Sequence, residues 1–221
     1  MQKFDTPAPV AAVITIPAGR VQLIAADRPD TTVEVRPAAP SSRRDAKAAE
    51  QVKVEYGDGV LRVQAPEANR VLGGSGSVEV TVQLPAGSSV EAKAAGADFR
   101  TVGRLGDVTF EASRATVKLD EAVGARLAVL AGDVTVGRLA GDAEVSTGKG
   151  DIQITEAMGG TVVLRTEDGA IEVGAAAGVS AAMDAGTSYG RISNALKNAD
   201  GAPGLTIHAT TARGDITARS L

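Results

Sequence analysis

Apolar and polar residues alternate along most of the chain, with a period of two rather than 3.6. The alternation is clear in "VITI", "VQLI", "TTVEVRP" and "VEVTVQLPAG". A period of two is typical of β-strands that bury one face. We therefore predict an all-β protein, with a hairpin turn at Tyr56–Val60, a short helix or loop over 41–51 and a flexible linker over 67–77.

A repeat of about 18 residues is superimposed on the alternation. A small residue opens each unit at intervals of 18, 17, 18, 19, 21 and 24 positions. An apolar residue always follows two positions later. The openings are Ala97, Ala115, Gly132, Gly150, Gly169, Gly190 and Gly214, and the apolar residues are Phe99, Val117, Val134, Ile152, Ile171, Ile192 and Ile216.

A second apolar series lies half a period away, so each unit contains two short strands. Its later inward pairs are expected at Val162/Leu164, Val179/Ala181 and Leu205/Ile207. One unit cannot bury its own apolar face, whereas stacked units can. We predict a single domain over residues 1–221, a parallel β-solenoid (β-helix) with irregular strand-rich coils over 1–87 and regular repeats over 88–221.

The Gly-Asp pairs at Gly132, Gly141 and Gly150 are interpreted as corners of the coil. Glycine tolerates the backbone conformations of sharp turns, and aspartate accepts hydrogen bonds from turn amides. The alternative is a calcium-binding repeat. The pattern supplies few carboxylates per corner, however, whereas calcium takes 6 to 8 oxygen ligands.

Composition narrows the classes of function. Aromatic residues make up 2% of the chain and cysteine is absent, so the core is aliphatic and holds no disulfide. The net charge is −4, with both signs interspersed. We predict no nucleic-acid partner, no metal and no cofactor.

The first twenty residues, "MQKFDTPAPVAAVITIPAGR", do not have the charged and then apolar regions of a signal peptide. The most apolar later stretch, Gly174–Met183, is too short to cross a bilayer. The sequence thus predicts no integral membrane segment and a cytoplasmic or envelope-associated protein.

The run "SVEVTVQLPAGSSVEAKAAGADFRTVGRLGDVTFEA", continued by "GDVTV", "GKGDIQI", "EDGAIEV" and "RGDITA", resembles the bacterial DUF4097 family of β-strand repeat proteins, often labelled "putative adhesins". The resemblance covers roughly Val10 to Leu221 and is strongest over Val78–Val173. It implies a parallel β-solenoid with no catalytic residues to carry over, and in some relatives a link to the cell envelope and its stress responses.

We therefore predict a protein that is not an enzyme. The alternative is a polysaccharide-binding or polysaccharide-processing solenoid that uses outward carboxylates and a base. Sugar-binding surfaces typically use exposed aromatic side chains, whereas Phe99 and Phe110 are predicted to be buried in the core. His208, the single histidine, is predicted to face outward without a partner for catalysis or metal binding. The residues considered for the alternative are Lys118, Glu144, Asp151 and Glu172.

A partner-binding surface is the favoured function. Tyr189 and Arg191 lie beside the enlarged corners of residues 175–204, and the final coil "RGDITARSL" ends at Leu221 without a covering element. An uncovered coil end offers unpaired backbone groups to another chain. We predict a non-enzymatic interaction scaffold that binds a protein partner or self-associates into a homo-oligomer through this coil end.

Overall fold

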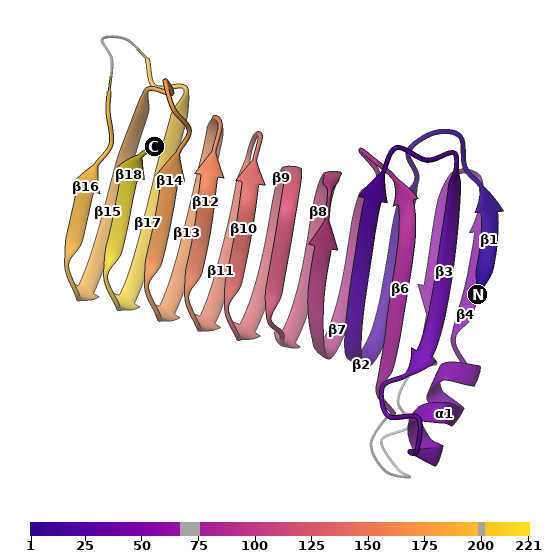
Figure 1. Ribbon diagram of the computed structural model, residues 1–221. Coiled ribbons are helices and arrows are strands. Elements are labelled where there is room, and N and C mark those ends of the chain that lie inside the picture. Colours follow the sequence, from indigo (N-terminus) through magenta and orange to yellow (C-terminus); the bar gives the residue numbers. More distant parts are fainter. Residues whose placement is uncertain (67–75, 199–201) are drawn as a thin grey trace. The chain divides into compact units, whose positions relative to one another are not determined.

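The computed structural model describes residues 1–66, 76–198 and 202–221. They form two compact units, Met1–Ala115 and Thr116–Leu221. Strands wound into coils make up both units (Figure 1). The single domain over residues 1–221 stays a prediction, and most of the expected linker at 67–77 lies outside the described residues.

The first unit is built on two long parallel strands. β2 (Ala11–Ala26) pairs with β7 (Ser89–Val102) from Ala11 to Ile24. On its other side β2 pairs with β5 (Val60–Gln64) along its first part and with β6 (Val78–Pro85) along its second part. β8 (Arg104–Arg114) pairs with the first part of β7. Coils that are consecutive in space are thus not consecutive in the sequence.

Antiparallel strands and a helix complete this unit. β4 (Lys53–Gly57) and β5 form the predicted hairpin, with positive φ angles at Asp58 and Gly59. β3 (Asp30–Pro37) pairs with β6, and β1 (Gln2–Asp5) pairs with β3. The predicted helix or loop is a helix, α1 (Arg43–Glu50), which Ser42 caps by accepting from the Asp45 amide.

The second unit is a regular parallel β-solenoid, as predicted. The coils form two parallel ladders of strands, called the two sheets below, and neighbouring coils pair in register; the long first strand of the unit takes part in both ladders and joins them. Figure 1 shows these strands in colours that run from rose through orange to yellow. The strands are β9 (Val117–Ala131), β10 (Val134–Leu139), β11 (Ala143–Lys149), β12 (Ile152–Ala157), β13 (Gly160–Asp168), β14 (Ile171–Ala175), β15 (Ala181–Tyr189), β16 (Ile192–Ala195), β17 (Leu205–Arg213) and β18 (Ile216–Ser220).

The apolar column predicted from the repeat is confirmed in this unit. Val117, Val134, Ile152 and Ile171 are paired neighbours in one sheet, and all are almost fully buried. Burial of such a column removes apolar surface from water at about 25 cal/mol per Å². In the first unit Phe99 and Phe110 are buried as predicted, and their rings stack with centroids 4.6 Å apart.

Corner glycines let neighbouring coils approach closely. A Cβ placed on Gly150 would lie 2.2 Å from the carbonyl oxygen of Gly132, and one placed on Gly169 would lie 1.9 Å from that of Gly150. Gly150 also has a φ of +143°, which L side chains rarely adopt. The glycines of the repeat are therefore required by the spacing of the coils.

Candidate interaction site at the open coil

The open end of the second unit is formed by a coil inserted into the repeat. Gly169 and Gly214 are 45 positions apart, which is one 18-residue period plus 27 residues. The strands that follow these two glycines, β14 and β18, are nevertheless direct neighbours in the sheet. β15 and β16 lie between β14 and β17 in the sequence, and they pair with the far sides of β17 and β18. We call β15 and β16 the open coil.

This order corrects one prediction. The final coil of the sequence, β17–β18, does not form the uncovered end, because it lies between β13–β14 and β15–β16. Along the sequence, the outermost coil, β15–β16, therefore comes before the coil β17–β18 that lies between it and β13–β14. Figure 1 shows β15 and β16 as the last strands of this unit.

The expected inward pair of the inserted coil is also corrected. Ala181 and Met183, not Val179 and Ala181, are in register with Leu205 and Ile207. A turn at Gly178, with a φ of +81°, precedes β15 and delays the start of the strand by two residues. The repeat could not reveal this shift, because the connection between β14 and β15 differs in length from the connections between the regular coils.

Tyr189 and Arg191 lie together at the corner of the open coil. Tyr189 is 77% exposed. The Arg191 amide donates to Asp215 Oδ1 at 2.9 Å, and its guanidinium donates to Asp215 Oδ2 at 3.1 Å. These two bonds hold the pKa of Asp215 below its usual value, and the bond from the backbone amide has the larger effect. Arg191 is thus fixed to the coil beneath, while Tyr189 is presented to solvent.

Leu221 is not part of this corner. It lies beyond the opposite end of β18, where its amide donates to the carbonyl oxygen of Ala175 at 2.9 Å. β18 separates the corner from Leu221 by five strand residues, or about 16 Å. The structure therefore brings together two of the three predicted partner-binding residues.

Apolar side chains of the open coil are only partly covered. Ile192 is 46% exposed, whereas Ile216, its neighbour in the sheet, is 1% exposed. Met183 is half-buried, while its neighbour Ile207 is fully buried. The apolar columns thus continue to the open coil and end there, exposed to solvent.

A threonine column, which the repeat analysis missed, fastens successive corners. Thr147 donates its hydroxyl to the carbonyl oxygen of Gly132 at 3.2 Å, and Thr166 donates to that of Gly150 at 3.1 Å. Thr211 and Thr187 make the equivalent bonds to Gly169 and Gly214. The signal was available as a repeated Thr-x-x-Gly: Thr147–Gly150, Thr166–Gly169, Thr187–Gly190 and Thr211–Gly214.

The corner aspartates accept hydrogen bonds from the next coil. Asp133 Oδ1 accepts from the Asp151 amide at 2.9 Å, and Asp151 Oδ1 accepts from the Ala170 amide at 2.7 Å. Within the described residues, no three His, Asp or Glu side chains gather in a way that could hold a metal ion. The Gly-Asp repeats are thus corners whose carboxylates join one coil to the next.

The carboxylates considered for a carbohydrate enzyme are not brought together. Glu144 lies on β11 between Arg126 and Arg165, each 3.6 Å away, whereas Glu172 lies on β14 in the other sheet. Lys118 shares the sheet of Glu172 but lies three coils away. His208 faces outward, as predicted, with Nδ1 3.7 Å from an oxygen of Asp184.

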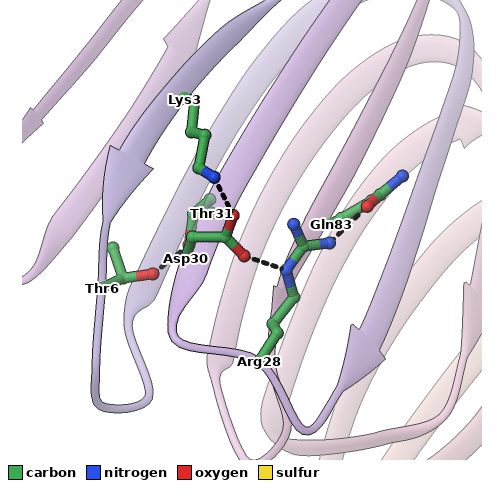
Figure 2. Close-up of polar contacts among 6 residues, drawn as sticks. All are labelled: Lys3, Thr6, Arg28, Asp30, Thr31 and Gln83. Carbon is green, nitrogen blue, oxygen red and sulfur yellow. Dashed lines mark hydrogen bonds and ion pairs between the residues drawn. The ribbon is translucent and has the colours of Figure 1, made fainter.

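A separate polar cluster fastens β1 to its neighbours in the first unit (Figure 2). Lys3 Nζ lies 2.9 Å from one oxygen of Asp30, and Arg28 Nε lies 2.7 Å from the other. The bonds from Arg28 and Lys3 lower the pKa of Asp30 to about 2, and the Arg28 bond has the larger effect. Arg28 also donates to Gln83. Each charge in this cluster has a partner within it, so its role is to hold the edge strands.

Parallel two-stranded coils, glycine-aspartate corners and an aliphatic core define a β-solenoid protein. The chain belongs to the Toastrack DUF4097 family, whose model matches residues 13–220. No curated protein matches the sequence significantly. Within the described residues, no helix is long and apolar enough to cross a membrane.

Solved structures resemble the chain along nearly its whole length at low identity. One is a "putative cell adhesion protein" from Clostridium sporogenes, with 12% identity, a TM-score of 0.43, and coverage of 100% of this chain and 98% of that chain. Another is a "putative adhesin" from Bacteroides fragilis, with 13% identity, a TM-score of 0.48, and coverage of 98% and 95%. A third is a "putative lipid binding protein" from Parabacteroides distasonis, with 8% identity, a TM-score of 0.42, and coverage of 98% and 95%.

Proposed function

We propose that the protein is a non-enzymatic interaction scaffold that binds a protein strand along the open coil. The observation that supports the proposal is the pairing of β15. This strand pairs with β17 along one edge and with no described strand along the other. An unpaired strand edge is a template for a strand from another chain.

The backbone of β15 defines the binding edge. The Leu205 amide donates to the carbonyl oxygen of Ser180 at 3.1 Å. In a parallel ladder alternate residues bond to the same neighbour, so Ser180, Ala182 and Asp184 face β17. On the open edge the Ala181 amide already donates to the carbonyl oxygen of Lys197 at 3.1 Å, and the Tyr189 carbonyl oxygen accepts from the Gly214 amide at 2.9 Å, so the free edge lies between these two residues. Met183 and Ala185 then direct their amides and carbonyls to the open edge, where an added strand would meet them.

Non-enzymatic binding fits the surface chemistry of the described residues. The carboxylates of the alternative enzymatic function are dispersed over two sheets. Glu144 is ion-paired, Asp151 accepts from a backbone amide, and Glu172 accepts from the Gln153 side chain. Pairing with a strand needs none of them, because the backbone supplies the contacts and side-chain pockets supply selectivity. Cytoplasmic location stays a prediction.

Binding of a fluorescent strand peptide tests this function. The probe is a nine-residue peptide with the sequence of β17, Leu205–Arg213, because β17 has the same length as β15 and pairs in parallel with the other edge of that strand. The control is the same peptide with proline at its centre, which removes a donor and disfavours pairing. We expect a rise in fluorescence polarisation with the first peptide only, and its loss in the variant Ala185→Pro.

Proline at position 185 alters the open edge and leaves the amides that face β17 in place. Circular dichroism checks that this variant keeps its strand content. Equal binding of both peptides, or binding unaffected by Ala185→Pro, would contradict strand addition at the open coil.

A further inference from the structure

The natural occupant of the open coil follows from its self-complementarity, its charge and its size. This step rests on the proposed function, because it names the partner of the same edge. Two identical strand edges that are related by a 180° rotation about an axis perpendicular to the strands run antiparallel. The backbone donors of each edge then face the acceptors of the other. A second copy of the chain therefore supplies a matching edge without any further requirement.

Charge on the open coil permits such pairing. A two-fold axis near Ala185 places Asp184 opposite Gly186 of the second copy, so that no like charges face each other directly. Asp184 lies 3.7 Å from Nδ1 of His208 in its own chain, and Arg191 is ion-paired with Asp215. β15 and β16 contain no lysine, arginine or proline, which are the usual means of keeping an edge apart from another copy.

The edge strands of the first unit are shorter than β15, and each of them includes a lysine. β1 has four residues and includes Lys3 and Asp5, and β4 has five residues and includes Lys53 and Glu55. Short, charged edge strands discourage pairing with another chain. A contact that joins the open coil to this unit of another copy, and so builds an open filament, is therefore disfavoured relative to two open coils meeting.

The free part of the open coil has the size of a small, reversible dimer interface. Residues 182–188 of β15 lie between the bonded Ala181 amide and the bonded Tyr189 carbonyl, which leaves about 23 Å of strand, and two sheets with their side chains are about 20 Å thick. The end of the coil thus offers about 460 Å² on each copy and about 920 Å² in total, in the range of weak, transient interfaces. The exposed part of Ile192 and the half-buried Met183 would form its apolar centre.

We infer that two copies of the chain associate through their open coils, with β15 of one copy antiparallel to β15 of the other, to form a closed symmetric dimer. Dimerisation pairs the open edge of each copy with that of the other. It also covers the exposed end of the apolar columns in each copy. Growth stops at two copies, because an isologous contact uses the same surface on both partners.

Sedimentation velocity and light scattering over low to high micromolar concentrations test the dimer. The variant Ile192→Lys introduces a charge at the centre of the interface, and Val123→Lys is the matched control on β9, since the wild-type side chains are 46% and 49% exposed. We expect wild type and Val123→Lys to be dimers, and Ile192→Lys to dimerise at least about tenfold more weakly, because buried interface charges cost more than 1.4 kcal/mol.

Three results would overturn the dimer: a monomeric wild type at every concentration, equal masses for the two variants, or species that grow beyond two copies. The peptide with the β17 sequence competes with the second copy for the same edge, so its binding is measured at the lowest protein concentration, where a dimer dissociates. Under that condition it separates this failure from failure of the proposed function. A monomer that still binds the peptide retains an open edge for another protein strand. A monomer that does not bind it refutes both proposals.

Discussion

The corner at Gly169 gives the sharpest test of how the coils pack. In the variant Gly169→Ala, the new Cβ would lie 1.9 Å from the carbonyl oxygen of Gly150 and 2.5 Å from its carbonyl carbon. Gly169 does not have a positive φ angle. The effect of the variant is therefore one of space between neighbouring coils and not of backbone conformation.

The magnitude follows from the bonds that join the two coils. Ordinary contact begins at 3.4 Å, so the corner must move by about 1.5 Å. The bonds from Gly150 N–H to Asp168 O, from Ala170 N–H to Asp151 Oδ1 and from Ile152 N–H to Ala170 O are 3.0, 2.7 and 2.9 Å long. Losing two or three of them costs about 2 to 3 kcal/mol, or about 4 to 12 °C in the unfolding midpoint.

Urea and thermal unfolding followed by far-ultraviolet circular dichroism measure this loss. The matched control is Gly204→Ala in the same unit, where the nearest atom to a new Cβ is 3.9 Å away. We expect the control to change the free energy of unfolding by less than about 0.5 kcal/mol. Equal unfolding midpoints for the two variants would refute the claim that coil spacing requires glycine at this corner.

Three further outcomes are expected. Thr166→Val removes the hydroxyl bond to Gly150 and should lower the free energy of unfolding by about 1 kcal/mol, whereas the exposed control Thr161→Val in the same strand should not; urea unfolding compares them. The lowered pKa of Asp30, about 2 against 3.8, makes its ionised form stabilising above pH 4 and progressively less so as the pH falls toward 2. Melting curves against pH should therefore show wild type above Asp30→Asn near neutrality and the two converging in acid; a constant difference would contradict the ion pairs. Deletion of residues 177–203 should leave a folded solenoid one coil shorter, and loss of a cooperative transition in circular dichroism would contradict the interpretation of this segment as an inserted coil.

The register of the deletion explains why it is expected to fold. Met158 and Gly159 connect β12 to β13, and the deletion would leave Ala176 and Gly204 as the corresponding pair between β14 and β17. Gly160 and Leu205, which follow these pairs, are already neighbours in the sheet. The joined chain would therefore repeat a connection that the protein already uses.

The local elements were determined by the sequence. Period-two alternation predicts the strands, because a strand exposes alternate residues to the core and to solvent. The hairpin at Tyr56–Val60 and the outward position of His208 depend on neighbours in the chain alone. The 18-residue repeat of glycine and apolar residues predicts parallel coils, because only stacking buries every unit.

The order of the coils was decided by the tertiary structure. Intervals of 21 and 24 residues marked an irregular region, but β15 and β17 carry similar small and apolar inward residues, and either strand offers an edge to β13. Which of them takes that place depends on contacts between strands far apart in the sequence. For this reason Tyr189 and Arg191 belong to the open coil, while Leu221, the end of the sequence, lies elsewhere.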